Sequence, residues 1–323
     1  MRLGYVLSCE ENGPADLIER AMAAERAGFE ELWISDHYHP WLDEQGQCPF
    51  VWSVIGALSQ VCSLPITTAV TCPTVRIHPA VIAQAAATSA VLTGGKFTLG
   101  VGTGEALNEH ILGDPWPPAG VRLAMLEEAV EVMRKLWTGR SVTHRGEHYT
   151  VESARLYTLP EQPPKVFMSA LGPKAVTLAA RIADGYIGVT PEPDLVRRFR
   201  TGGGGSKPAQ AGFFACYAPT EDEALRIAHE KWRNMALPGE LTVMLPSPRH
   251  FEQASRLVTP DMLKNVVVLG PDPDRHLAMI EQYDKAGYDD VFVANTGPYY
   301  RELCDLYATE ILPRVWRRET IGA

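Results

Sequence analysis

The chain has 323 residues, of which 46% are hydrophobic and 21% are charged, so it can bury a sizeable core and lacks a disordered composition. The formal net charge of −9 argues against nucleic acid as the default partner. The sequence contains no run of about 18 apolar residues, so we expect no membrane span.

The cysteines and the first residues of the chain indicate the cellular compartment of the protein. Six cysteines are scattered along the chain without a Cys-x-x-Cys pair, at positions 9, 48, 62, 72, 216 and 304. This pattern favours reduced thiols over a disulfide framework or a zinc site. Residues 1–7 lack the long apolar segment of a signal peptide and begin like a first strand. We therefore expect a cytoplasmic protein.

Strand and helix patterns alternate along the chain. Short apolar runs predict strands at residues 2–8, 31–35, 66–72, 97–101, 165–170, 187–189, 213–217, 265–269 and 291–293. Helical spacing of apolar residues predicts helices at residues 14–27, 79–92 and 121–137, and a further helix opens at Gly172-Pro173.

Three similar joints connect these patterns. Gly28, Gly185 and Gly287 each follow the end of a helix pattern and precede an aromatic residue and a short apolar run. Each glycine is therefore predicted to be the left-handed cap of a helix that leads into a strand. The chain holds about eight strand–helix units, which predicts a (β/α)8 barrel, although an open doubly wound sheet would also fit. No linker divides the chain, and we expect one domain over residues 1–323.

Three segments interrupt the alternation. Residues 141–151 predict a β-hairpin with its turn at Arg145-Gly146-Glu147. Residues 201–210 contain four consecutive glycines and predict a flexible loop. Residues 232–260 are rich in proline, and we expect them to form a short helical insertion over the mouth of the barrel.

Two predicted strands end in residues that can transfer protons. Asp36 and His37 directly follow one strand, and Glu105 follows another at residues 97–101. Barrel enzymes carry their chemistry at the carboxyl ends of strands, so His37 and Glu105 are candidates for an acid/base pair. Trp41 lies in the same loop as His37. Taken alone, Asp36 and His37 fit a helix cap and a surface histidine equally well.

Glycines mark two possible ligand-binding turns. Gly100, Gly102 and Gly104 alternate where the strand ends, which lets a ligand approach the main chain. They lack the full dinucleotide-binding spacing, because residue 107 is leucine. Gly172 precedes a helix whose N-terminus can hold an anion such as phosphate, or which is an ordinary helix begun by proline.

Two other chemistries find no support in the sequence. His39, His78 and His110 form no spaced set with carboxylates, so we infer no metal site. The chain contains no Gly-x-Ser-x-Gly motif and no context that would activate a cysteine, which disfavours a nucleophilic hydrolase.

Four segments together resemble the luciferase-like superfamily of flavin and deazaflavin oxidoreductases. They are residues 35–41 (SDHYHPW), 72–84 (CPTVRIHPAVIAQ), 100–109 (GVGTGEALNE) and 183–187 (ADGYI). Within this superfamily, the GTGEALNE segment is similar to that of the glucose-6-phosphate dehydrogenases that use the deazaflavin coenzyme F420. The resemblance covers most of the chain.

The resemblance implies a (β/α)8 barrel, a homodimer and a non-proline cis peptide bond at Ala69–Val70 behind the deazaflavin. It implies that His37 acts as general base on a substrate hydroxyl, that Trp41 steadies the developing charge and that Glu105 protonates the deazaflavin ring. The residues that it implies in coenzyme binding are Asp36, Ala69, Val70, Cys72, Thr103, Gly104, Asn108, Leu171, Gly172, Lys174 and Ala175.

One departure from the resemblance bears on the substrate. The sugar-phosphate dehydrogenases hold the substrate phosphate with two lysines and an arginine. Here Glu192 stands at one lysine position, Asn265 stands at the arginine position beside Lys264, and residues 237–260 offer no partner for the second lysine. These changes remove charge-assisted bonds to a phosphate dianion, so glucose 6-phosphate is not the expected substrate.

The predicted function is hydride transfer between coenzyme F420 and a small organic substrate, either an alcohol–carbonyl pair or an imine or enone. One alternative is a monooxygenase of the same fold that uses flavin mononucleotide (FMN). A second alternative is a barrel that binds the coenzyme without turnover, against which the presence of both His37 and Glu105 speaks.

Overall fold

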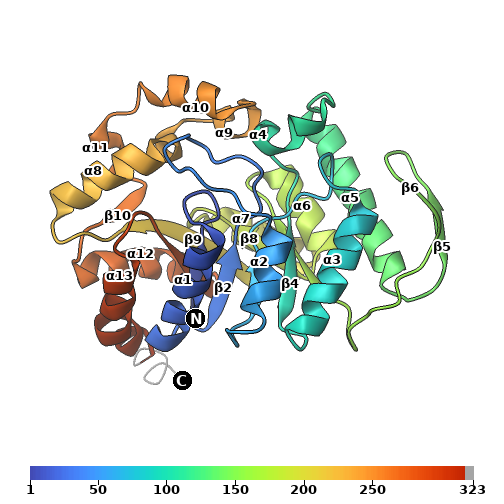
Figure 1. The fold of residues 1–323 in the computed structure, drawn as a ribbon, viewed down its shortest axis with the longest axis horizontal. Coiled ribbons are helices and arrows are strands. Elements are labelled where there is room, and N and C mark those ends of the chain that lie inside the picture. The colour runs from blue at the N-terminus through green and yellow to red at the C-terminus, as the bar shows by residue number, and fades with distance from the viewer. Residues whose placement is uncertain (317–323) are drawn as a thin grey trace.

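The computed structural model describes residues 1–316, and it shows parallel strands rolled into a closed barrel with helices outside (Figure 1). Each strand pairs in parallel with its neighbours, and the pairing of β8 with β9 closes the ring, in which β11 lies between β9 and β1. This closure confirms the (β/α)8 prediction over the open sheet. The eight closing strands are β1 (Arg2–Leu7), β2 (Glu31–Ile34), β3 (Ile66–Thr68), β4 (Phe97–Val101), β7 (Lys165–Ser169), β8 (Gly185–Gly188), β9 (Ala209–Cys216) and β11 (Asp290–Asn295).

A ninth parallel strand explains why the sequence holds more strand patterns than a barrel needs. The first residues of the long strand β9 pair with β8, and its last residues pair with β10 (Val267–Leu269). The strand expected at residues 265–269 therefore lies outside the ring. The loop expected at residues 201–210 is shorter than predicted, because a π-helical turn, η2 (Arg200–Gly204), and the start of β9 take up both of its ends.

The long helices occupy nearly the predicted residues. The predicted helices at residues 14–27 and 79–92 match α1 (Pro14–Ala27) and α3 (Pro79–Leu92), and the third is α5 (Ala119–Leu136). The other helices in the described chain are α2 (Val51–Leu58), α4 (Ala106–Glu109), η1 (His110–Leu112), α6 (Pro173–Ile182), α7 (Pro193–Phe199), α8 (Glu221–Trp232), η3 (Arg233–Ala236), α9 (Leu241–Met244), α10 (Pro248–Ser255), α11 (Pro260–Leu263), α12 (Pro273–Ala286), α13 (Tyr300–Leu306) and η4 (Tyr307–Ile311).

Two of the three predicted glycine caps are left-handed. Gly28 has φ 96° and Gly287 has φ 91°, and both end their helices. The prediction is wrong for Gly185, which is the first residue of β8, while α6 ends in extended backbone at Ala183. Position 185 requires glycine for a different reason, because a Cβ there would come within 2.6 Å of the Phe167 ring on the neighbouring strand.

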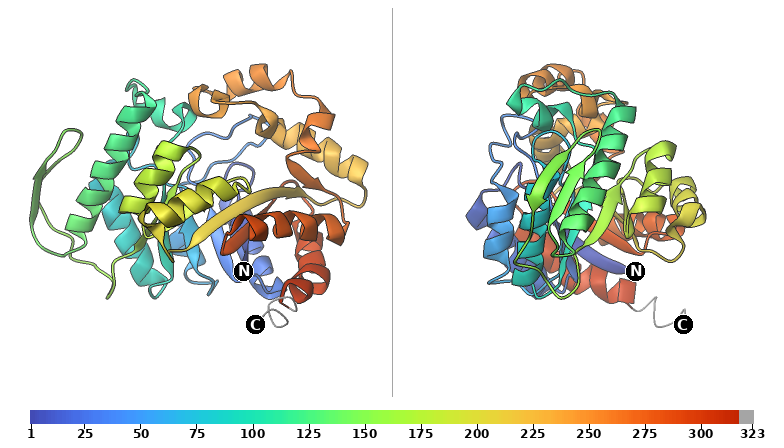
Figure 2. Two further views of the ribbon diagram at one scale, coloured as in Figure 1. Left: turned by 180° about the vertical axis from the view of Figure 1, so that it is seen from behind. Right: turned by 90° about the vertical axis from the view of Figure 1, so that its right-hand side faces the viewer.

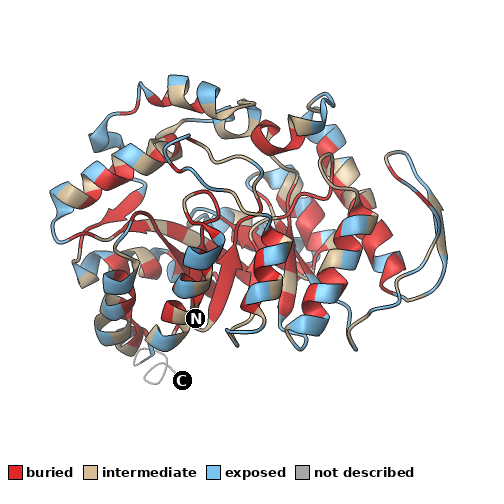
Figure 3. Cartoon of the chain, in the orientation of Figure 1, coloured by how far each residue is buried: buried red, intermediate tan, exposed pale blue. Residues whose placement is uncertain are grey.

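Buried residues form the strands and the inward faces of the helices (Figure 3). Inside the barrel, Trp33 stacks on Phe292 with ring centroids 4.2 Å apart. The amino ends of the strands carry a polar layer instead, in which Arg2 bonds Asp290 at 2.8 Å and Gln210 donates to both Glu31 and Asp290. Polar side chains at this end serve stability, because barrel enzymes place their chemistry at the opposite end.

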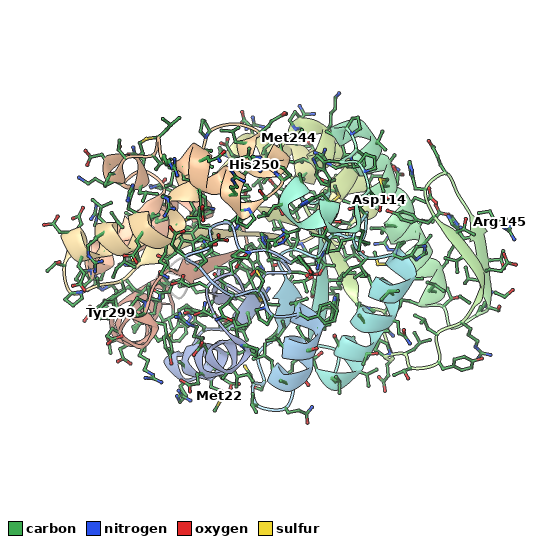
Figure 4. All side chains as sticks on the ribbon, turned by 45° about the horizontal axis from the view of Figure 1, so that its top comes forward. Met22, Asp114, Arg145, Met244, His250 and Tyr299 are labelled. Carbon is green, nitrogen blue, oxygen red and sulfur yellow. The ribbon has the colours of Figure 1, made fainter. Side chains whose placement is uncertain are left out.

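Two insertions extend from the barrel. The predicted hairpin is present as β5 (Val142–Arg145) and β6 (Thr150–Ala154), and Arg145 marks it at the edge of the molecule (Figure 4). The predicted helical insertion comprises η3, α9, α10 and α11 and lies across the top of the barrel, where Figure 4 labels Met244 and His250. Within residues 1–316, no helix has both the length and the apolar character needed to cross a bilayer.

Candidate active site

The predicted catalytic residues meet at the carboxyl end of the barrel. His37 follows β2 and Glu105 follows β4. Because parallel strands end at the same rim, residues that are far apart in the sequence come together there. His37 Nε2 lies 3.8 Å from Glu105 Oε2, so the structure brings together the two groups that the sequence singled out.

The surroundings of His37 prepare one ring nitrogen to accept a proton. Its Nδ1 lies 3.3 Å from the carbonyl oxygen of His39. A carbonyl oxygen only accepts, so this bond places the ring proton on Nδ1 and leaves Nε2 available. The Trp41 ring packs against His37 with centroids 4.9 Å apart. His37 is therefore oriented from two sides.

A second carboxylate, Glu10, belongs to this site, and the sequence analysis missed it. Glu10 Oε1 lies 3.5 Å from His37 Nε2, and its side chain is buried. Ser35 Oγ donates to Glu10 Oε2 at 2.8 Å, which fixes the carboxylate. Glu10 comes shortly after β1 as Glu105 comes shortly after β4, and this repeated position was the signal that could have identified it.

Asn108 links the loop of His37 to the carboxylate of Glu105. Its Oδ1 accepts the main-chain N–H groups of Tyr38 and His39 at 2.9 and 3.1 Å. Its Nδ2 donates to Glu105 Oε2 at 3.2 Å. Asn108 is buried, and its single amide connects the loop of His37 with the loop of Glu105.

A buried ion network lies beneath the same loops. Arg76 donates to Asp36 Oδ1 at 2.8 Å, and Thr71 Oγ1 donates to Asp36 Oδ2 at 2.8 Å. The main-chain N–H of Arg76 donates to Glu109 at 2.8 Å. Burial raises the pKa of Glu109, and its bonds from Arg76 oppose that rise. Asp36 thus anchors the start of the His37 loop, and its contact with a coenzyme stays a prediction.

The floor of the site fits a flat ring that lies against the main chain. The peptide bond between Ala69 and Val70 is cis, at the position that the resemblance implies. A Cβ on Gly102 would come within 2.7 Å of Val70 Cγ2, so glycine is required beside it. Gly104 has φ 83°, which also favours glycine. Cys72 is buried, and burial raises the pKa of its thiol, so the thiol stays neutral.

The turn after β7 fits a phosphate. Gly172 precedes α6 with open space around its missing Cβ. Val176 N–H is bonded to Gly172 O, which leaves the N–H groups of Lys174 and Ala175 directed out of the first turn. This turn contains no acidic residue, so the helix terminus keeps its partial positive charge. The remaining predicted coenzyme residues, Thr103 and Leu171, follow β4 and β7 on this rim.

The helical insertion gives the site an apolar wall. Phe251 of α10 packs edge-on against Trp41 with centroids 5.0 Å apart. The same apolar cluster contains Leu42, Leu107, Leu237 and Leu245. In the described part of the chain, no group of three or more His, Cys, Asp or Glu side chains could hold a metal ion.

Comparison with known proteins shows the family of the chain. The model of the luciferase-like monooxygenase family matches residues 1–290, which is most of the chain. The chain belongs to the luciferase-like monooxygenase family.

Curated members of the luciferase-like family are similar over their full length. The F420-dependent glucose-6-phosphate dehydrogenase of Microbacterium testaceum is 34% identical over 331 residues, covering 98% of each chain. The protein of the same name from Beutenbergia cavernae is 33% identical over 332 residues, covering 99% of this chain and 98% of its own.

Solved structures are also similar to this chain. An F420-dependent secondary alcohol dehydrogenase, bound to an F420–acetone adduct, superposes with a TM-score of 0.89 at 30% identity, covering 97% of this chain and 98% of its own. The F420-dependent tetrahydromethanopterin reductase of Methanopyrus kandleri has a TM-score of 0.78 at 22% identity, covering 97% and 99%, and shares the fold.

Glu192 and Asn265, the two residues expected to face the substrate, are more exposed than His37 and Glu105. Glu192 is exposed at the start of α7, and Asn265 is exposed before β10. Within residues 1–316, no hydrogen bond or ion pair connects either side chain to His37 or Glu105. Lys264, the cation beside Asn265, lies 2.7 Å from Asp261.

Proposed function

We propose that this luciferase-like protein is a coenzyme F420-dependent oxidoreductase that transfers a hydride between the deazaflavin and a small neutral alcohol or its carbonyl product. The observation that carries the proposal is the meeting of His37 and Glu105 at 3.8 Å above the glycine-lined floor. The likeness to F420-dependent relatives over nearly the whole chain supports the choice of coenzyme. When bound, the coenzyme supplies a ring carbon that accepts or gives up a hydride.

His37 would take the proton of the substrate hydroxyl. Its Nε2 is the available nitrogen, because Nδ1 is engaged by the carbonyl of His39. Taking up that proton gives the ring a positive charge, which Glu10 stabilises from 3.5 Å. Trp41 keeps the ring in place and covers it from water. In the reverse direction His37 returns the proton to the carbonyl oxygen.

Glu105 would give up or take back the second proton, the one that accompanies the hydride. Asn108 Nδ2 holds one of its oxygens at 3.2 Å and so aims the carboxyl group. Because Glu105 and His37 lie 3.8 Å apart, the proton gained by one can be passed back to the other between turnovers. The hydroxyl proton that His37 would take then replaces the proton that Glu105 would give up, so the proton count balances.

The charges around the mouth support a neutral substrate rather than a sugar phosphate. Lys264 is paired with Asp261, and Glu192 adds a negative charge at the start of α7, where the resemblance implies a lysine. The insertion packs the buried Phe251 against the half-buried Trp41, whose remaining exposed ring surface favours an apolar substituent on the substrate. A dianion would lose attraction and meet repulsion at this mouth.

The experiment tests a panel of substrates and monitors turnover through the absorbance of the coenzyme. Purified protein with oxidised F420 is mixed in turn with primary alcohols, secondary alcohols and glucose 6-phosphate. Reduced F420 is mixed with ketones, imines and enones. We expect the coenzyme absorbance to change rapidly with small neutral alcohols or their ketones and to change little with the sugar phosphate. Turnover confined to enones or imines would overturn the alcohol assignment, and no turnover with any class would overturn the proposed function.

A further inference from the structure

Three consecutive residues where α8 ends bind the two loops that carry Glu10 and His37. In the loop after β1, Glu11 Oε2 accepts the indole N–H of Trp232 at 2.6 Å. In the loop after β2, the main-chain oxygen of Glu44 accepts from Lys231, and its carboxylate accepts from Arg233 at 3.0 Å. Seen from behind, α8 and the helical insertion lie above these blue loops (Figure 2). The end of α8 therefore holds both loops from above.

Glu11 joins three elements through one carboxylate. Its Oε2 accepts from Trp232, the last residue of α8, and its Oε1 accepts the main-chain N–H of Gly297 after β11 at 2.8 Å. Burial raises the pKa of Glu11, and the bonds from Trp232 and Gly297 and the charge of Arg20 oppose that rise. Both oxygens are engaged by donors, so the side chain has one fixed position.

Fixing Glu11 also fixes the residue before it. Glu10 faces the other way along the chain, with Oε1 3.5 Å from His37 Nε2 and Oε2 bonded by Ser35 Oγ at 2.8 Å. The two carboxylates share one peptide unit, so a displacement of Glu11 moves the backbone that carries Glu10. Because charge interaction in a buried site changes steeply with distance, such a displacement alters how well Glu10 stabilises a charged His37 ring.

We propose that Glu11 is a positioning residue of this enzyme, through which the end of α8 holds Glu10 against His37. This inference rests on the proposed function, in which His37 takes up the hydroxyl proton and becomes charged. Glu10 must be in place at that moment, and the bond between Glu11 and Trp232 keeps it there. The helical insertion begins directly after Trp232, so one indole connects the segment that covers the barrel to the residues that move the proton.

Two variants break this bond from opposite sides. Trp232→Phe removes the indole N–H and keeps an aromatic ring against Phe214, whose centroid lies 5.3 Å from that of Trp232. Glu11→Gln keeps the length of the side chain but offers a single acceptor oxygen to two donors. Each should lower kcat with an alcohol substrate on the order of tenfold, because the charged ring is less well stabilised. KM and the dissociation constant of F420 should change by less than about twofold.

A reading that does not depend on turnover accompanies the kinetics. Hydrogen–deuterium exchange of the main chain at residues 8–13 should be faster in Trp232→Phe than in the unaltered protein, because the loop has lost its contact with α8. Denaturant unfolding of the same samples shows that both variants remain folded. Exchange at the unaltered rate would mean that Trp232 does not hold this loop, and would overturn the inference.

A double-mutant cycle separates positioning from a general effect on the fold. If Glu11 acts through Glu10, the loss of kcat caused by Glu11→Gln should disappear when Glu10→Gln is already present. The matched control is Trp137→Phe, which removes the indole N–H that donates to the Ala83 carbonyl at 2.9 Å between α5 and α3. This control should lower the stability of the protein and leave kcat unchanged.

The outcomes distinguish the inference from the proposed function. Unchanged kcat in Glu11→Gln and Trp232→Phe would overturn the inference and leave the proposed function standing. The same conclusion follows if the loss persists in full beside Glu10→Gln, or if Trp137→Phe shows an equal loss of kcat. If the unaltered protein turns over no alcohol or carbonyl compound with F420, both the proposed function and this inference fail.

Discussion

His37 Nε2 and Glu105 Oε2 lie 3.8 Å apart, although one residue follows β2 and the other follows β4. Asn108 maintains this distance, because its amide binds the main chain of the His37 loop on one side and Glu105 on the other. The site is therefore built as one hydrogen-bonded unit, and substitutions in it should affect proton transfer more than folding.

Replacing Glu105 by glutamine should slow turnover by roughly 10²–10⁴-fold, the usual loss when a positioned proton donor is removed. The amide keeps the shape and the contact with Asn108 but cannot supply the proton. Coenzyme binding, measured by fluorescence titration, should stay nearly unchanged. Glu147→Gln in the exposed hairpin turn is the matched control and should have no effect. Unaltered turnover in Glu105→Gln would remove this residue from the mechanism.

Replacing His37 by alanine should cause a loss of similar size when the substrate is an alcohol. Without the ring, the site lacks the nitrogen that would accept the hydroxyl proton, and the buried carboxylate of Glu10 loses its partner. Steady-state rates with an alcohol and with a reducible double bond distinguish the cases, and His144→Ala in the hairpin is the control. Full activity of His37→Ala beside an inactive Glu105→Gln would mean that the reaction reduces an activated double bond.

Glucose 6-phosphate should be a poor substrate, despite the names of the relatives that are 33–34% identical. The double variant Glu192→Lys/Asn265→Arg should move the enzyme toward sugar phosphates, because each restored charge-assisted bond contributes about 1–3 kcal/mol. Steady-state kinetics measure kcat and KM for both proteins. The control Glu161→Lys/Gln60→Arg makes the same charge change elsewhere. Robust turnover of the sugar phosphate by the unaltered protein would show that other cations, such as Arg249, form a phosphate site.

Acid should destabilise the fold partly through His276, which is fully buried between Tyr307 Oη and the carbonyl of Gly270. Burial lowers the pKa of His276 to about 4, against 6.5 for the free side chain. The unfolded chain therefore binds the proton first, so the free energy of unfolding falls as the pH drops from about 6.5 to about 4. The loss is on the order of 3 kcal/mol.

Denaturant unfolding at several pH values in this range measures the effect of His276. The variant His276→Gln retains an amide donor and acceptor but does not titrate, so its stability should depend less on pH than that of the unaltered protein. Identical pH dependence of the two proteins would show that His276 is not the titrating group.

The sequence predicted those parts of the fold that depend on local patterns. The helices at Pro14–Ala27 and Pro79–Leu92 begin with proline and carry regular apolar spacing, so their bounds could be read directly. The position of β10 could not be predicted from local patterns. β8 pairs with the first residues of β9 and β10 pairs with the last, an arrangement that depends on the length of β9. The prediction of a helix cap at Gly185 was wrong for a similar reason, because the Phe167 ring that requires a glycine there comes from another strand.

The candidate site shows the same limit. His37 and Glu105 stood out because each follows an apolar run that ends abruptly. Glu10 was missed, because its importance comes from the packing of β1 beside β2, which brings it to His37. The contact of Phe251 with Trp41 could not be predicted either. The proline-rich insertion has no periodicity from which to predict which side chain faces the barrel.

The most direct test of the account is a comparison of coenzyme affinities. The purified protein is titrated with F420 and with FMN under the same conditions, and the dissociation constants are compared. The Gly172 turn would hold the phosphate of either coenzyme, so a preference would come from the residues that would line the ring site, Val70 and Gly102 among them. We expect F420 to bind much more tightly than FMN. Equal or tighter binding of FMN would contradict the account and favour a flavin monooxygenase.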